Sequence, residues 1–254
     1  MTDHIFVGPS LAGSERLDLI SAQWHPPAQG GDLLALDLGA DDRVCLIDGV
    51  FEAAPAVRHK EILLLLSEGV PVFGASSMGA LRAAELQQFG MKGTGRIHAA
   101  FASGAFTRDD WVALRHAPVE LGCQPLTVAL VDLIFGLQHA VRQHMLSAKQ
   151  GNSLLRAGAT LFYQDRDWPA IERASSLSDM ELEPFRKWRT KSWFSQKTRD
   201  ALNCLNLMNN HVQKDRCRPD FVDTPFLRQF ASASGNDSIK LGPRSGDQNI
   251  LQQS

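Results

Sequence analysis

The ten residues from Val72 to Leu81, VFGASSMGAL, constrain the fold of this chain more than any other segment. An apolar run leads into small residues and then into a helical pattern, which is typical of a buried strand that turns sharply into a helix. Only small residues fit beside so tight a backbone turn. The helix is predicted to run from Met78 to about Phe89 and to stop at Gly90.

Strands and helices alternate along the first part of the chain. The apolar runs with the length of strands are Ile5–Gly8, Val44–Ile47 and Val70–Phe73. Helices are predicted around Asp32–Leu38 and from Pro55 to about Ser67, where Gly69 follows. Strands separated by helices predict a parallel sheet with right-handed crossovers. The expected fold class is α/β, with a Rossmann-like parallel-sheet core in the amino-terminal part and a mostly helical carboxyl-terminal half.

The pattern becomes helical after Gly93. The segment TRDD at 107–110 resembles a capping box, and Pro125 is predicted to open a long helical segment that ends near Leu146. Helical patterning continues to about Asn209. Residues 232–254 are rich in Ser, Gly, Gln and Asn, and cannot bury enough surface to become ordered. The predicted organisation is an α/β core with the site at 1–95, a helical part packed on it at 96–231, and a flexible tail at 232–254.

The composition excludes several classes of function. Hydrophobic residues make up 44% of the chain, and the net charge of −2 offers no basic field for nucleic acid. The longest apolar run, Ile62–Leu66, is too short to span a bilayer, and the amino terminus does not resemble a signal peptide, so a cytoplasmic protein is expected. No cysteine pair has the spacing of a zinc site, so neither a metal nor a cofactor is predicted; the cysteines are Cys45, Cys123, Cys204 and Cys217.

Two adjacent serines lie in the turn between the strand and the helix. The pattern Ala75-x-Ser77-x-Gly79 matches a nucleophile elbow in which Ala replaces the first Gly. The unpaired N–H groups at the start of the helix could hold an oxyanion there. Two other interpretations stay open: Ser76 or Ser77 is an N-cap, or the turn binds an anion without catalysis. On the pattern alone, capping is the most frequent of the three roles.

Asp48 and His59 form a second group of polar residues. Asp48 ends a strand of the same sheet and can reach the same edge as Ser77. His59 lies about one turn into the next helix and could act as a general base, although a histidine on a solvated helix face is the alternative. Lys60 precedes an apolar run, so its charge needs a partner if the helix is buried. One pocket at the carboxyl edge of the sheet is expected to contain Ser77, Asp48, His59 and Glu85.

A third group follows the turn. Arg82 and Glu85 are three residues apart on the predicted helix and can form an ion pair. Asp109, Asp110 and His116 could orient a base or bind a metal ion, but their spacing matches no known ligand set. No metal site is therefore predicted.

Several segments together resemble the TfuA-like family. They are LIDGVFE at 46–52 with HKEIL at 59–63, GASSMGALRAAEL at 74–86, FGM at 89–91 with GxGxI at 93–97, and DDxVAxxH at 109–116. FVGPS at 6–10 and PPAxG at 26–30 also fit, so the resemblance covers roughly residues 4–130. Arg115 departs from the pattern, which has a smaller or apolar residue there, and the helical remainder matches weakly.

The resemblance implies an accessory protein for a YcaO-family enzyme, which replaces a peptide-backbone oxygen with sulfur. The YcaO partner uses ATP to activate the amide oxygen, and sulfur then arrives as sulfide or a carried equivalent. The implied task of this chain is to release that sulfur from a thiocarboxylated, ubiquitin-like sulfur-carrier protein. The substrate peptide is a further possible partner, whereas nucleic acid and membranes are not expected.

Release of sulfide from a thiocarboxylate is an acyl transfer, which suits a serine elbow. Ser77 would attack, the amides of Met78 and Gly79 would hold the oxyanion, His59 or His116 would be the base, and Asp48 or Asp109 would orient it. The predicted binding residues are Gly74, Ala75, Ser76, Met78, Gly79, Lys60, Glu52, Arg82 and Asp109. A non-catalytic adaptor that docks the carrier or the peptide onto the YcaO enzyme is the main alternative, and a serine hydrolase unrelated to sulfur is a third hypothesis.

Overall fold

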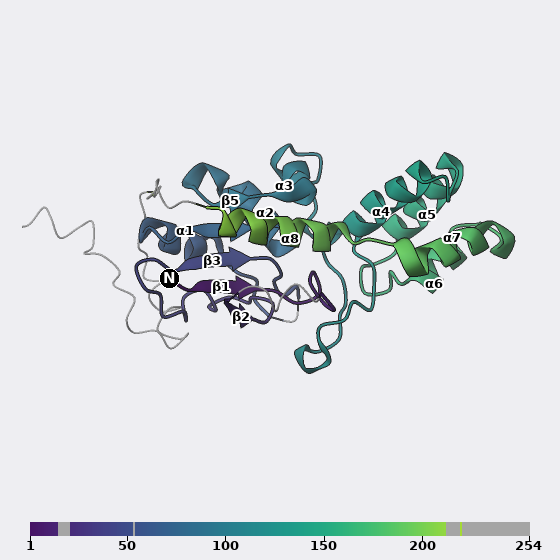
Figure 1. Ribbon diagram of the computed structural model, residues 1–254. Helices are drawn as coiled ribbons and strands as arrows, with labels where there is room; N and C mark the ends of the chain where they lie inside the picture. Colours follow the sequence, from purple (N-terminus) through teal and green to yellow (C-terminus); the bar gives the residue numbers. More distant parts are fainter. Residues whose placement is uncertain (15–20, 53, 212–218, 220–254) are drawn as a thin grey trace, which may run out of the picture.

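The computed structural model describes residues 1–14, 21–52, 54–211 and 219 (Figure 1). Its centre is a five-stranded sheet in the order β2-β1-β3-β4-β5, in which every neighbouring pair is parallel. The strands are β1 (Asp3–Phe6), β2 (Gln23–His25), β3 (Arg43–Leu46), β4 (Val72–Gly74) and β5 (Lys92–Gly93). The predicted α/β fold with a helical carboxyl-terminal half is confirmed.

The strand order changes direction between β1 and β3. β2 lies on one side of β1, whereas β3, β4 and β5 follow one another on the other side. The N–H groups of Ile47 and Asp48 both donate to the carbonyl of Phe6, over 3.0 and 3.1 Å, so the loops after β1 and β3 begin side by side. Open parallel sheets bind their ligands outside the carboxyl ends of the strands at such a switch point.

Helices cover both faces of the sheet. The helices α1 (His59–Ser67) and α2 (Met78–Leu86) bury their apolar side chains against one face, which includes Leu46 and Val72. The helix α8 (Gln196–Asn209) covers the other face, where Cys204 and Met208 meet Ile5, Cys45 and Phe73. Figure 1 shows that α8 runs from the helical part of the chain back across the sheet. The last described helix therefore carries side chains to the sheet.

The remaining helices lie mostly beyond the sheet (Figure 1). They are α3 (Gly95–Ala102), which contacts α2 and α8, and α4 (Leu130–Arg142), α5 (Ala148–Thr160), α6 (Trp168–Ala174) and α7 (Asp179–Ser192). The last four enclose an apolar core that includes Phe185, with Trp168, Trp188 and Trp193 packed against it. Three short 3₁₀ helices are η2 (Gln87–Phe89), η3 (Asp109–Trp111) and η4 (Val119–Leu121). Across the described ranges, no helix is both long enough and apolar enough to cross a membrane.

Two predicted helices differ from the structure near the amino terminus. Residues 31–35 form only a turn, in which the Gly31 carbonyl accepts from the N–H groups of Leu34 and Ala35, and residues 36–38 are not helical. The helix predicted from Pro55 begins at His59, because the carbonyls of Pro55 and Val57 accept hydrogen bonds from Gly30 and Arg82 instead of from the next turn. Strands β2 and β5 were not predicted.

Two later boundaries also differ. Pro125 does not open a helix, because its neighbours pair with residues 115–117 in a hairpin, and α4 begins at Leu130. The element after Thr107 begins at Asp109, with Arg108 as its N-cap and no side-chain capping bond. The predicted tail at 232–254 lies outside the described residues, and the proposed domain boundary near residue 95 stays a prediction.

Candidate functional site

The turn between β4 and α2 is tighter at Ser76 than the sequence indicates. Ser76 has a φ of 69°, and the N–H of Ser77 donates to the carbonyl of Ala75 over 2.8 Å. These features define a γ-turn centred on Ser76, a strained conformation that non-glycine residues rarely adopt. The elbow pattern places Ser77 at the nucleophile position, but the residue at the centre of the turn is Ser76.

Both serines of the turn are buried. Ser76 and Ser77 lie almost entirely out of contact with solvent, so the turn does not expose a hydroxyl as the elbow pattern predicts. Ser77 is the N-cap of α2 by position, but its side chain accepts no hydrogen bond from the helix. Side-chain capping therefore does not account for Ser77.

The two glycines on either side of the serines, Gly74 and Gly79, allow close packing. A Cβ on Gly79 would overlap the carbonyl of Leu46, and a Cβ on Gly74 would overlap the carbonyl of Gly79. The N–H of Gly79 donates to the carbonyl of Ile47 over 3.2 Å. The Gly79 amide is thus engaged with the strand end and is not free to hold an oxyanion, contrary to the prediction.

A buried hydrogen-bond network joins this turn to the loops after β1 and β3. The hydroxyl of Ser10 donates to Asp48 Oδ1 over 2.7 Å, and the N–H groups of Gly8 and Ser10 donate to Asp48 Oδ2 over 2.9 Å each. The hydroxyls of Ser10 and Ser76 are 2.7 Å apart. Because a hydroxyl carries one proton and Ser10 gives its own to the carboxylate, Ser76 donates to Ser10.

Lys197, from α8, is the fourth member of this group. Its Nζ lies 3.8 Å from Asp48 Oδ1 and donates to the carbonyl of Val112 over 2.8 Å, and the side chain is buried. Burial lowers the pKa of Lys197, and the opposing charges of Asp48 and Asp132 only partly offset this. A buried lysine with a lowered pKa is suited to accept and return a proton. Ser10, Asp48, Ser76 and Lys197 are called the switch-point cluster below.

A cavity of about 350 Å³, here called the lysine cavity, adjoins the switch-point cluster. Lys197 belongs to both, since it contacts Asp48 on one side and lines the cavity on the other. Asp132 also lines it, and burial raises the pKa of that carboxyl despite its hydrogen bonds from Lys197 N and Ser195 Oγ. The other lining residues are Pro9, Ala12, Leu114, Pro125, Leu126, Thr127, Val128, Trp168, Trp193, Ser195 and Thr198.

A second group of predicted residues lies elsewhere, at the start of α1 and along α2. His59 Nε2 and Arg82 Nη1 each lie 2.7 Å from Glu85 Oε2. Burial alone would raise the pKa of Glu85, but the hydrogen bonds from His59 and Arg82 outweigh it and lower that pKa. Because the side chains of His59 and Glu85 are 47% and 37% exposed, this is a surface ion pair of small energetic value.

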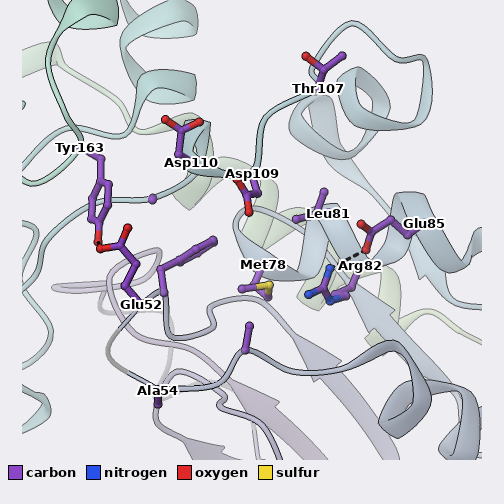
Figure 2. A pocket seen from close by; sticks show the side chains of 13 residues that line it. Glu52, Ala54, Met78, Leu81, Arg82, Glu85, Thr107, Asp109, Asp110 and Tyr163 are labelled. Atoms are coloured by element: carbon purple, nitrogen blue, oxygen red, sulfur yellow. Dashed lines mark hydrogen bonds and ion pairs between the residues drawn. The ribbon is translucent and has the colours of Figure 1, made fainter.

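A second cavity, of about 430 Å³, opens beside these residues and is called the glutamate cavity. Figure 2 shows Arg82, Glu85, Asp109 and Glu52 around it, with Met78 and Leu81 between them. Glu52 accepts a hydrogen bond from the Tyr163 hydroxyl over 2.8 Å. The other lining residues are Phe51, Ala54, Ala56, Thr107, Asp110 and Ala113.

The structure thus divides the predicted site between two places. Asp48 and Ser76 join the switch-point cluster with Ser77 beside them, whereas Glu85, Arg82, Glu52, Met78 and Asp109 line the glutamate cavity. Neither Ser77 nor Asp48 lines that cavity.

The remaining predicted residues lie outside both cavities. Ala75 is buried under α8, and Lys60 lies in the first turn of α1. His116 belongs to a hairpin, where its Nδ1 donates to the carbonyl of Ala117 over 2.7 Å. Among the described residues, no group of three or more His, Cys, Asp or Glu side chains could hold a metal ion.

Sequence reasoning missed Ser10 and Lys197. Ser10 could have been found, because it is a polar residue directly after the first strand and strand ends meet at the carboxyl edge. Lys197 stands in no motif, and only the return of α8 across the sheet brings it to Asp48.

Comparison with known proteins identifies a family that matches part of the chain. No curated protein matches the chain. Residues 48–167 match the family described as TfuA-like protein. This region contains Asp48, the serine turn and every lining residue of the glutamate cavity. This match supports the assignment of residues 48–167 to the TfuA-like family.

Proposed function

We propose that this chain hydrolyses a thiocarboxylated sulfur-carrier protein and so supplies sulfide to a YcaO-family enzyme. The TfuA-like family is generally linked to thioamide-forming, YcaO-associated systems. The observation that supports the finer proposal is the switch-point cluster, in which a strained serine, a relay serine, a carboxylate and a buried lysine follow one another.

The first step is an attack of a serine oxygen on the thiocarboxylate carbon. Ser76 is the favoured nucleophile, because it donates to Ser10, which in turn donates to Asp48 beside Lys197. The new C–O bond gives a tetrahedral oxyanion, whose collapse breaks the C–S bond. The serine proton passes through the relay to the leaving sulfur, which departs as HS⁻. Water then hydrolyses the ester and leaves the carrier with an ordinary carboxylate.

The surrounding fold supplies two contributions to this step. The amino terminus of α2 carries a partial positive charge next to the turn, which favours the developing oxyanion. The lowered pKa of Lys197 increases the fraction of neutral amine that can take the serine proton. The predicted bases His59 and His116 bond instead to Glu85 and to the carbonyl of Ala117.

A non-catalytic adaptor is the second candidate function, and the burial of Ser76 and Ser77 favours it. In that case the turn would be a rigid backbone site, and the chain would bring the carrier to the YcaO enzyme. The two proposals differ in one experiment, in which purified chain is mixed with thiocarboxylated carrier without YcaO enzyme or ATP. The hydrolase releases sulfide under these conditions, whereas the adaptor binds the carrier and releases none.

A further inference from the structure

Residues 115–127 form a hairpin that projects from the body of the molecule, seen as the teal loop between α3 and α4 in Figure 1. Main-chain hydrogen bonds join its two arms: Ala117 N donates to Gln124 O over 2.9 Å, and Leu126 N donates to Arg115 O over 2.8 Å. The N–H of Arg115 also donates to the hydroxyl of Thr127 over 2.7 Å. These bonds make the hairpin a defined projection with a fixed tip.

Large apolar side chains are exposed along this hairpin. Val119 and Leu121, in the short helix η4 at its tip, are 53% and 68% exposed, and Leu126 on the returning arm is 51% exposed. A single exposed apolar side chain is ordinary, but a group of them on one projecting element marks an interaction surface.

The base of the hairpin is part of the candidate site. Pro125, Leu126 and Thr127 line the lysine cavity together with Lys197. Cys123 is buried against Gly8, whose N–H donates to Asp48. Leu126 therefore belongs both to the exposed surface of the hairpin and to the wall of the lysine cavity.

We propose that this hairpin is the docking surface for the folded body of the sulfur carrier, whose carboxyl-terminal tail enters the lysine cavity beside Lys197. The inference rests on the proposed function. A cavity of about 350 Å³ cannot admit a folded domain, but it can hold a short extended tail. The carrier must then stay outside, and the exposed apolar side chains that continue from the cavity wall are the surface it meets.

The test is the double variant Val119→Asp/Leu121→Asp, assayed for sulfide release from thiocarboxylated carrier and from thioacetate. The variant should raise KM for the carrier by on the order of tenfold, as expected when apolar anchors of an interface are replaced by charges. Its kcat on the carrier and its turnover of thioacetate should equal those of the wild type, because thioacetate has no body to dock. Met180→Asp, which replaces a side chain that is 88% exposed on α7, is the matched control and should change neither.

Three results would overturn the proposal: an unchanged KM for the carrier, a parallel loss of thioacetate turnover, or a wild-type dimer that the double variant dissociates. Direct binding of the carrier, measured by calorimetry, separates this inference from the proposed function. If the wild type binds the carrier without releasing sulfide, hydrolysis is wrong, and weaker binding by the double variant still supports the docking surface. If the wild type neither binds nor hydrolyses the carrier, both are wrong.

Discussion

The switch-point cluster and the glutamate cavity are two separate places in the molecule, and both contain residues that the sequence analysis singled out. In the first, Ser10, Asp48, Ser76 and Lys197 are buried and bonded to one another. Beside the second, His59 and Arg82 form ion pairs with Glu85, and the side chains of His59 and Glu85 are 47% and 37% exposed. Buried charges are costly to keep, whereas exposed pairs cost and contribute little. The comparison favours the switch-point cluster as the place of the chemistry, although its residues are less conspicuous in the sequence.

Replacement of Lys197 should have the largest effect. Lys197→Met removes the proposed proton acceptor, and sulfide release should fall by on the order of a hundredfold or more, as is usual for loss of general acid–base catalysis. Lys149→Met, on the exposed side of α5, should release sulfide at the wild-type rate. Equal rates for the Lys197 variant and the control would remove the lysine from the mechanism.

The two serines of the turn should differ in their effects. Ser76→Ala should lower sulfide release by on the order of a hundredfold, whereas Ser77→Ala should cost less than about tenfold, because only Ser76 is bonded to the relay. Loss of the Ser76 bond should lower the free energy of unfolding by about 1 kcal/mol, so both variants should fold. The opposite order of rates would return the role of nucleophile to Ser77.

The pH dependence of sulfide release should report Lys197. Burial lowers its pKa from the ordinary value of 10.5, so the neutral amine is gained as pH rises through a pKa below that value. The rate should therefore increase with pH across this window, while Asp48 and Asp132 oppose the shift. In Lys197→Arg, whose side chain stays charged, this rise should disappear; its persistence would assign the titration to another group.

Replacement of Gly79 should affect stability. Gly79→Ala places a Cβ against the carbonyl of Leu46, so α2 must move away from β3, at a cost of about 1–3 kcal/mol in the free energy of unfolding. Gly151→Ala is the control, because its Cβ would meet a side-chain atom, Val141 Cγ2, and no backbone carbonyl. Chemical denaturation measures both, and similar losses would mean that the close approach of α2 to β3 is not specific to Gly79.

Replacement of His59 should have the smallest effect. His59→Ala removes one partner of a half-exposed ion pair, so the free energy of unfolding should fall by about 1 kcal/mol or less. Sulfide release should stay at the wild-type rate. A hundredfold loss of release in this variant would instead place the chemistry in the glutamate cavity.

The parts of the fold that local sequence determines could be predicted. The strand, turn and helix from Val72 to Leu86 follow from an apolar run, small residues and a helical pattern, and the parallel sheet follows from the alternation of such units. The predicted helix boundaries were less accurate where backbone carbonyls accept hydrogen bonds from residues distant in sequence, as those of Pro55 and Val57 do before α1.

The site was only partly predictable, because it depends on contacts that are distant in sequence. Asp48 and the serine turn lie at neighbouring strand ends, and the rule for parallel sheets locates both. Lys197 reaches the same place from a helix 149 positions later in the chain than Asp48 (197 − 48), and its charge lies in no recognisable motif. The sequence also does not show which of the two adjacent serines lies at the centre of the γ-turn, because either could occupy that position.

The most direct test of the account is the rate of sulfide release by the double variant Ser76→Ala/Ser77→Ala, with purified thiocarboxylated carrier and no YcaO enzyme. This variant removes both hydroxyls of the turn and leaves Ser10, Asp48 and Lys197 in place. The account predicts that the wild type releases sulfide and that the double variant releases it no faster than the uncatalysed reaction. Release by the double variant at the wild-type rate would contradict the claim that the switch-point cluster carries the chemistry.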